Sequence, residues 1–201
     1  MSYLFTVTLA ESGTTDNVIA LRYVILTIGK HMPLSFYDAS IPLLVRGLHN
    51  LSAVLAKAKA HADARAIEPS VLIGSRLAPD MFPLSRQVQI ATDTAKGCAA
   101  RLGGVEIPSF EDTESTFEEL QERIAKTLAF IETIPARQLE DASQREIQLK
   151  LRGRDVTFTA QAYLFTFVLP NFYFHITTAY GILRHNGVEL GKADYLGNLL
   201  G

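Results

Sequence analysis

Residues 160–186, AQAYLFTFVLPNFYFHITTAYGILRHN, decide the fold of this 201-residue chain. The stretch is apolar on nearly every side, which is typical of a helix buried inside a protein. Asn171 and His175 interrupt it with polar groups, so it is not read as a membrane span. We therefore expect one long helix over 160–186, the most buried of the protein, with a kink at Pro170.

Three stretches upstream show the same helical spacing, with apolar side chains three and four residues apart. They cover residues 38–64, residues 83–102, and a segment from about Thr113 to Pro135. In the last of these, Ser115 and Glu118 have the spacing of a capping box. Four helices of this length predict an all-α protein, a four-helix bundle.

One stretch of the sequence breaks the helical period. Residues 146–159 alternate apolar and polar side chains around Gly153, which predicts a small β-hairpin inserted before the last helix. The tail over 188–201 is rich in glycine and is expected to be irregular.

The first thirty-one residues differ from the rest, because they alternate like strands around a Gly-Thr-Thr-Asp turn. We interpret residues 1–31 as an N-terminal appendage, with translation starting naturally at Met32, and residues 32–201 as the bundle domain. The alternative is a true β-hairpin that packs on the bundle.

Composition excludes several classes of function. The 19 basic and 21 acidic residues nearly balance, which argues against a nucleic-acid partner. No apolar run is long enough for a membrane span. The single cysteine, Cys98, excludes an intramolecular disulfide and a cysteine-based zinc site, and it fits a reducing, cytoplasmic location. We expect Cys98 to be an inert buried thiol.

Polar residues on the inward face of the last helix are the first candidates for a site. Asn171 and His175 are one helical turn apart, the spacing at which two side chains can bind one metal ion or ligand. The alternative is a buried histidine whose ring is satisfied by a neighbouring carbonyl or carboxylate. Thr178 lies on the same face and can bond back to its own helix.

Candidates on the other helices are weaker. Asp93 is the only carboxylate over residues 83–102, and Gln89 lies one turn before it, although both fall off the apolar stripe and solvation is the alternative. His49 sits at the edge of the apolar stripe of the first helix. The aromatic residues of the last helix exceed what one bundle interior would use, so we expect a homodimer.

Five short motifs carry a resemblance to a known family. They are Phe36–Ser40, Leu77–Leu84, Gln87–Asp93, Leu169–His175 and Arg184–Gly187. Over residues 33–197 the chain resembles a bacterial domain family of unknown function within the DinB/YfiT-like superfamily of four-helix-bundle metalloenzymes.

The resemblance implies a divalent metal ion held by three histidines, one on an early helix and two in an HxxxH motif on the last helix. Here the HxxxH position reads Asn171-x-x-x-His175, and Gln89 or Asp93 lies near the place of the early histidine. The implied metal ligands are thus His175, Asn171 and Asp93, with Gln89, His49 and Thr178 around the pocket. Oxygen ligands of this kind suit Mg²⁺ or Mn²⁺.

Two functions follow from these residues. The first is a DinB-like bundle with a degenerate metal or small-ligand pocket, where the metal would act as a Lewis acid or His175 as a general base. The second is a non-catalytic dimeric protein whose polar core groups satisfy one another.

Overall fold

The computed structural model of the protein describes residues 34–151 and 153–198, so the expectations for residues 1–31 concern a segment outside the described residues. The described chain is mostly helical and contains a two-stranded antiparallel hairpin. No helix in this part of the chain combines the length and the apolar character needed to cross a membrane.

In chain order the elements are α2 (Ile41–Arg65), α3 (Pro69–Ile73), α4 (Leu84–Gly103), α5 (Phe117–Glu132), the 3₁₀ turns η1 (Ala136–Leu139) and η2 (Ala142–Gln144), β1 (Glu146–Leu151), β2 (Arg154–Thr159), α6 (Ala160–Ala162), the π-helix η3 (Tyr163–Val168), α7 (Leu169–His185) and α8 (Lys192–Leu196).

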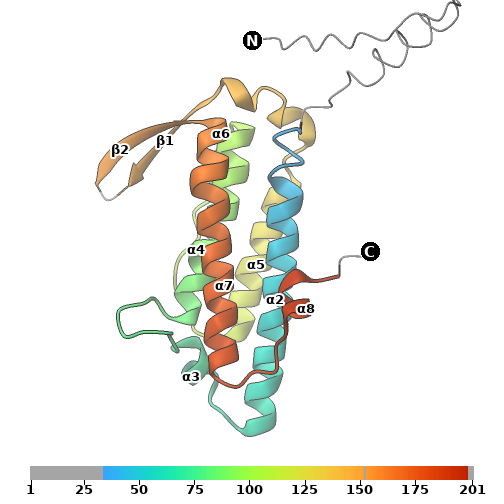
Figure 1. The fold of residues 1–201 in the computed structure, drawn as a ribbon, viewed down its shortest axis with the longest axis vertical. Coiled ribbons are helices and arrows are strands. Elements are labelled where there is room, and N and C mark those ends of the chain that lie inside the picture. The colour runs from blue at the N-terminus through green and yellow to red at the C-terminus, as the bar shows by residue number, and fades with distance from the viewer. Residues whose placement is uncertain (1–33, 152, 199–201) are drawn as a thin grey trace, which may run out of the picture. The chain divides into compact units, whose positions relative to one another are not determined.

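The four longest described helices lie alongside one another, as Figure 1 shows. Helix α4 packs against α5 and α7, and α2 packs against the same two helices. Their apolar stripes meet in one core, because each stripe faces the space that the four helices share. The largest fully buried side chains of this core are Tyr163, Phe117, Phe172, Leu44, Leu48, Leu51, Leu55, Leu72, Leu84, Leu102, Leu120 and Ile124.

Helix α4 is the most buried of the long helices, so the expectation that the last helix would be the most buried is wrong. Fourteen of the twenty residues of α4 are buried, compared with seven of the seventeen in α7. Small residues such as Ala91 and Ala95 let neighbouring elements approach α4 closely. The loop after α4 covers a further side, since the Phe110 ring centroid lies 4.0 Å from the Lys96 ammonium.

The start of α5 is fixed by a capping box one residue later than the sequence predicted. The Thr116 hydroxyl accepts the Glu119 N–H at 3.1 Å, and the Glu119 carboxylate accepts the Thr116 N–H at 3.0 Å. Ser115, the predicted cap, donates its own N–H to the same carboxylate at 2.6 Å. Thr116 is therefore the N-cap, and the predicted pair of Ser115 and Glu118 is wrong.

The hairpin before the last helix is confirmed. Strands β1 and β2 pair antiparallel, with Glu146 opposite Thr159 and Leu151 opposite Arg154. Ile147 and Leu149 of β1 are buried while their neighbours are exposed, so one face of the hairpin leans on the helical core.

The last long helix contains a π-helical segment in front of Pro170. Proline has no N–H to donate, so the helical hydrogen-bond ladder is interrupted at this point. The N–H of Leu169 bonds to the carbonyl of Leu164, five residues earlier, which is the π-helical pattern. A π-helix, η3, therefore ends just before Pro170, while the kink predicted at Pro170 itself stays a prediction.

The tail contains a short helix, α8, where the sequence predicted irregular structure. Contacts with α2 stabilise it: Lys57 pairs with Asp194 at 2.6 Å, and Asn50 Nδ2 donates to the Tyr195 carbonyl at 3.0 Å. Local propensity could not reveal α8, because these partners lie far away in the sequence.

Helices α2 and α7 approach each other closely at Gly47. A Cβ atom at this position would lie 2.6 Å from Cε1 of Phe172, which is fully buried. Glycine is therefore required here by the space that the Phe172 ring occupies.

Candidate functional site

The imidazole of His175 is held between α7 and α4. The residue is 7% exposed, and its Nδ1 lies 2.7 Å from Oε1 of Gln87 on α4. The amide carbonyl of Gln87 thus satisfies one ring nitrogen of His175. This agrees with the second interpretation of the sequence, a buried histidine bonded to a neighbouring carbonyl.

The orientation of Gln87 fixes the tautomer of this ring. Gln87 Nε2 donates to the carbonyl of Phe82 at 2.9 Å, so the amide oxygen of Gln87 must face His175. An oxygen can only accept, hence Nδ1 of His175 carries the proton. The other ring nitrogen, Nε2, then holds a lone pair, and no other described residue hydrogen-bonds to it.

The environment keeps this imidazole neutral. Burial, together with a smaller contribution from the positive charge of Arg86, lowers the pKa of His175 from its ordinary 6.5 to about 4. A neutral ring with an available lone pair can accept a hydrogen bond or a proton, or can bind a metal ion.

The hydrogen bonds of Asn171, one turn before His175, also determine how its side-chain amide is oriented. Thr94 on α4 donates its hydroxyl proton to the Ile90 carbonyl at 2.7 Å, so its oxygen can only accept from Asn171. Asn171 Nδ2 therefore donates to Thr94 at 2.8 Å. The remaining atom, Oδ1, is an acceptor for which no described residue provides a donor.

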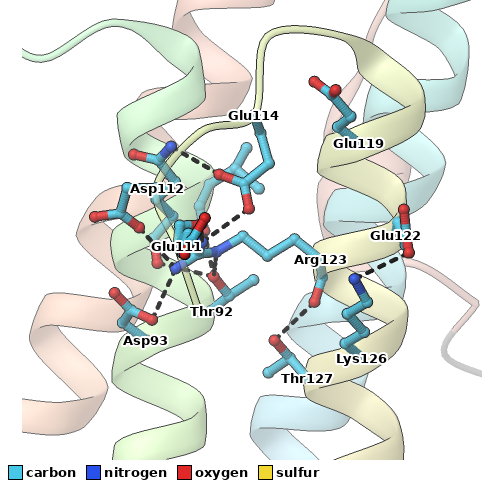
Figure 2. A network of polar contacts seen from close by, with 12 residues as sticks. Thr92, Asp93, Glu111, Asp112, Glu114, Glu119, Glu122, Arg123, Lys126 and Thr127 are labelled. Carbon is cyan, nitrogen blue, oxygen red and sulfur yellow. Dashed lines mark hydrogen bonds and ion pairs between the residues drawn. The ribbon is translucent and has the colours of Figure 1, made fainter. Parts of the chain in front are cut away.

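A second polar cluster lies on the other flank of α4 and is centred on Arg123 of α5 (Figure 2). Arg123 is 2% exposed, and its guanidinium holds Asp93 at 2.8 Å, Asp112 at 3.0 Å and Glu114 at 2.8 Å. It also donates to the Thr92 hydroxyl at 2.8 Å. This single side chain therefore ties α4, α5 and the loop between them together.

The charges of the cluster compensate one another. Burial opposes the charge of Arg123, but its bond to Glu114 and the charges of Asp93 and Asp112 outweigh burial and raise the pKa of Arg123. Gln89 joins the cluster by donating to Glu114 at 2.9 Å and accepting from Arg86 at 3.1 Å.

A cavity of about 340 Å³ opens beside this cluster, between the loop and α5. Its lining includes Glu114, Glu119 and Glu122. Each has a partner within the chain: Glu114 binds Arg123, Glu119 closes the capping box, and Glu122 pairs with Lys126 at 2.9 Å. Glu111 also lines the cavity, but only its backbone carbonyl accepts from Arg123, at 2.9 Å, so its carboxylate is the one acidic group of the lining that no described residue pairs with.

The structure separates the residues that the sequence grouped as metal ligands. His175 and Asn171 share one face of α7, whereas Asp93 belongs to the Arg123 cluster and also pairs with Lys96 at 3.0 Å. Gln89 is only 5% exposed, so the alternative that it is solvated is wrong, and it too contacts the Arg123 cluster.

The two remaining predicted pocket residues lie elsewhere or bond within their own helix. His49 is exposed on α2. Thr178 is buried one turn after His175, and its hydroxyl donates to the Phe174 carbonyl at 2.7 Å, as its back-bonding alternative predicts.

A tight divalent-metal site does not fit these residues as they stand. His175 Nε2 and Asn171 Oδ1 could serve as ligands, but Asp93 is already held by two cations, and the charge of Arg86 acts on the His175 ring. Among residues 34–151 and 153–198, no three His, Cys, Asp or Glu side chains are grouped to hold a metal ion.

Sequence analysis missed two central residues, Gln87 and Arg123. Both carried a signal, because both lie on inward faces: Gln87 is three residues after Leu84, and Arg123 is three residues after Leu120. A polar residue within an apolar stripe indicates a buried polar partner. Cys98, in contrast, behaves as expected, since it is buried and burial raises its pKa to about 12.

Comparison with known proteins places the chain in a family. Residues 36–196 match the model of DUF1993, a domain of unknown function. The crystal structure of a DinB family member protein from Shewanella denitrificans is similar, with a TM-score of 0.75 and 44% sequence identity over 82% of this chain and 93% of that chain. No curated protein matches.

The fold and these matches define a DinB-like helical protein, as the sequence motifs predicted. The chain belongs to the DUF1993 family.

Proposed function

We propose that residues 32–201 form a four-helix bundle of the DinB type and that residues 1–31 are an appendage to it. The side-by-side packing of α2, α4, α5 and α7 supports the bundle, and so does the DinB-like neighbour of 44% identity. The family match, which begins at residue 36, supports the boundary. The single cysteine of the chain, Cys98, is buried and free. Because disulfides are rare in reducing compartments, we propose a cytoplasmic location for the protein.

We propose that this bundle binds a small ligand at His175. The observation that carries the proposal is an imidazole 7% exposed, with Nδ1 fixed by Gln87 and Nε2 without a partner in the described chain. Among the described residues no buried side-chain nitrogen or oxygen lacks a hydrogen-bond partner, so Nε2 is not enclosed but reaches the surface, where the donor of a ligand can pair with it.

The metal assignment to His175, Asn171 and Asp93 stays a prediction for the same site. It requires Asp93 to leave Arg123 and Lys96, with which it is paired. We therefore favour a small molecule over a resident metal ion.

Native mass spectrometry and elemental analysis test the ligand site on protein purified without chelator or affinity tag. We expect a bound small molecule that is lost in His175→Ala and kept in His49→Ala, the matched change at an exposed histidine. A bound metal ion lost only in His175→Ala would support the metal assignment instead. Bare wild-type protein whose His175 ring resonances respond neither to a metabolite mixture nor to Mg²⁺ would contradict both.

A specific observation favours a second function, that of a non-catalytic homodimer. Phe165, Tyr173 and Phe174 on η3 and α7 are 47%, 36% and 55% exposed. Residues 156–183 contain no Asp, Glu, Lys or Arg, so this segment brings no charge of its own to the surface, although Arg46 of α2 lies beside Tyr173. Exposed aromatic surface with little charge is typical of the centre of protein interfaces.

Analytical ultracentrifugation tests the dimer. We expect wild-type protein to sediment as a dimer and Phe165→Glu to sediment as a monomer, with Val71→Glu, at an exposed apolar residue of α3, as the control. A monomeric wild type at the highest concentration measured would rule this function out.

A further inference from the structure

Two acceptor atoms lie one turn apart on the same face of α7. Asn171 and His175 have the i, i+4 spacing, which places their Cβ atoms about 5–6 Å apart. The network around Gln87 leaves Nε2 of His175 as an acceptor, and the network around Thr94 leaves Oδ1 of Asn171 as an acceptor. The N–H of His175 is used on α4, and Asn171 uses one of its two N–H donors there.

This pair of acceptors selects among ligands. A carboxylate or phosphate oxygen cannot donate, so it would meet the lone pairs of Nε2 and Oδ1 and gain no hydrogen bond from these two atoms. A cationic group could donate, but the His175 ring is only 7% exposed, so a charge beside it loses hydration, and Arg86, although paired with Asp112, adds a positive charge nearby. A neutral N–H or O–H donor satisfies both conditions.

Exposed apolar side chains lie beside His175 and along the neighbouring part of α4. The Phe174 ring contacts the His175 ring edge to face, with centroids 5.2 Å apart, and is 55% exposed. Phe82, whose carbonyl holds Gln87, is 56% exposed. Half-buried Ile90 lies on α4 between Gln87 and Thr94 in sequence, one turn from each. These apolar surfaces suit a flat aromatic molecule.

We propose that the site takes a neutral aromatic molecule whose N–H donors bond to Nε2 of His175 and Oδ1 of Asn171, such as an aromatic carboxamide. This inference rests on the proposed function of His175 as a ligand contact. It adds the chemical class of the ligand.

Three probes of nearly equal size separate the chemistries: benzamide is a neutral donor, benzoate is an anionic acceptor, and benzylamine is a cation at neutral pH. Each is titrated into the full chain while the nitrogen resonances of the His175 ring are followed by NMR. We expect benzamide to shift Nε2 and to bind at least about tenfold more tightly than benzoate, because two hydrogen bonds separate them. Benzylamine should bind more weakly than benzamide as well.

Variants assign the response to the two acceptors. Asn171→Leu and His175→Ala should each weaken benzamide binding, while His49→Ala should leave it unchanged. Circular dichroism shows whether each variant is folded. If His175→Ala does not fold, Asn171→Leu alone tests the contribution of the acceptors to benzamide binding.

The outcomes distinguish the two levels of the proposal. If benzoate or benzylamine shifts the His175 ring as strongly as benzamide, the ligand class is wrong and the ligand site stands. If no probe moves the ring and the wild type carries no bound mass, both the ligand class and the proposed function fail.

Discussion

Gln87 Oε1 and His175 Nδ1 join α4 to α7 at 2.7 Å, and this contact determines which ring nitrogen a ligand would meet. Because Gln87 donates its own N–H to the Phe82 carbonyl, the pair cannot reverse without breaking a second bond. The chemistry of the candidate site therefore depends on a neutral amide on the neighbouring helix.

Replacing that amide with a carboxylate should change the titration of the ring. In Gln87→Glu a negative charge would face Nδ1 and stabilise the imidazolium, so we expect the pKa of His175 to rise well above about 4. An NMR pH titration of the ring measures it. Gln89→Glu, which changes an amide that contacts Glu114 and Arg86, is the control and should move the pKa less. An unchanged His175 pKa in Gln87→Glu would contradict the contact.

The buried ring should make stability depend on pH. Below pH 6.5 the unfolded chain protonates this histidine, whereas the native chain does not until about pH 4. Unfolding thus takes up a proton in this window, and stability falls as the pH falls, by about 2 kcal/mol between pH 6.5 and pH 5. Urea unfolding from pH 7 to pH 5 measures the loss. His175→Gln should lack this component, and equal pH dependence in both proteins would refute it.

The Arg123 cluster should account for a large part of the stability of the loop over residues 105–116. Arg123→Met leaves Asp93, Asp112 and Glu114 without their shared cation, and we expect a loss of about 3–5 kcal/mol. Chemical unfolding measures this loss, and hydrogen exchange should show faster exchange in the loop. Lys126→Ala, which breaks only the exposed pair with Glu122, should cost at most about 1 kcal/mol. Similar losses in the two variants would show that the cluster adds nothing.

The N-cap of α5 can be identified by comparing two neighbours. Thr116→Ala removes the hydroxyl that accepts the Glu119 N–H, and we expect a loss of about 1 kcal/mol. Ser115→Ala keeps the backbone bond from Ser115 to Glu119 and should cost less. Thermal unfolding measures both, and a larger effect at Ser115 would place the cap there instead.

Two helix glycines should respond oppositely to alanine. Gly47→Ala would force a methyl group to within 2.6 Å of the buried Phe172 ring, so we expect destabilisation by about 1–3 kcal/mol. At Gly181 the new methyl would meet Leu77 at an ordinary 3.5 Å, and the better helix former should stabilise the protein by up to about 1 kcal/mol. Unfolding midpoints test the pair. Equal effects would contradict the close approach of α2 and α7.

The sequence predicted the long helices, the hairpin and the family because these depend on local periodicity and on motifs within continuous segments. It placed the α5 cap at Ser115 because Ser115–Glu118 and Thr116–Glu119 have the same spacing, and only the backbone geometry distinguishes them. The apolar stripe predicted for residues 83–102 steps from Leu84 to Val88, four residues later. Gln87 lies between these two positions and was therefore not recognised as an inward-facing residue. The partners of Gln87 and Arg123 come from other elements, which no local pattern reveals.

The π-helix η3 has a consequence for where the two ends of the last helix point. Tyr163 and His175 both face α4, where Tyr163 accepts from Arg101 and His175 meets Gln87. They are twelve residues apart, and at about 100° per residue an unbroken α-helix would point them about 120° away from each other. The wider turn of a π-helix absorbs one surplus residue, which reduces the offset to about 20°. The extra residue of η3 thus keeps Tyr163 and His175 on the same side of the helix. If one residue of Tyr163–Val168 were deleted, the two side chains would stay on that side only if the segment became an ordinary α-helix.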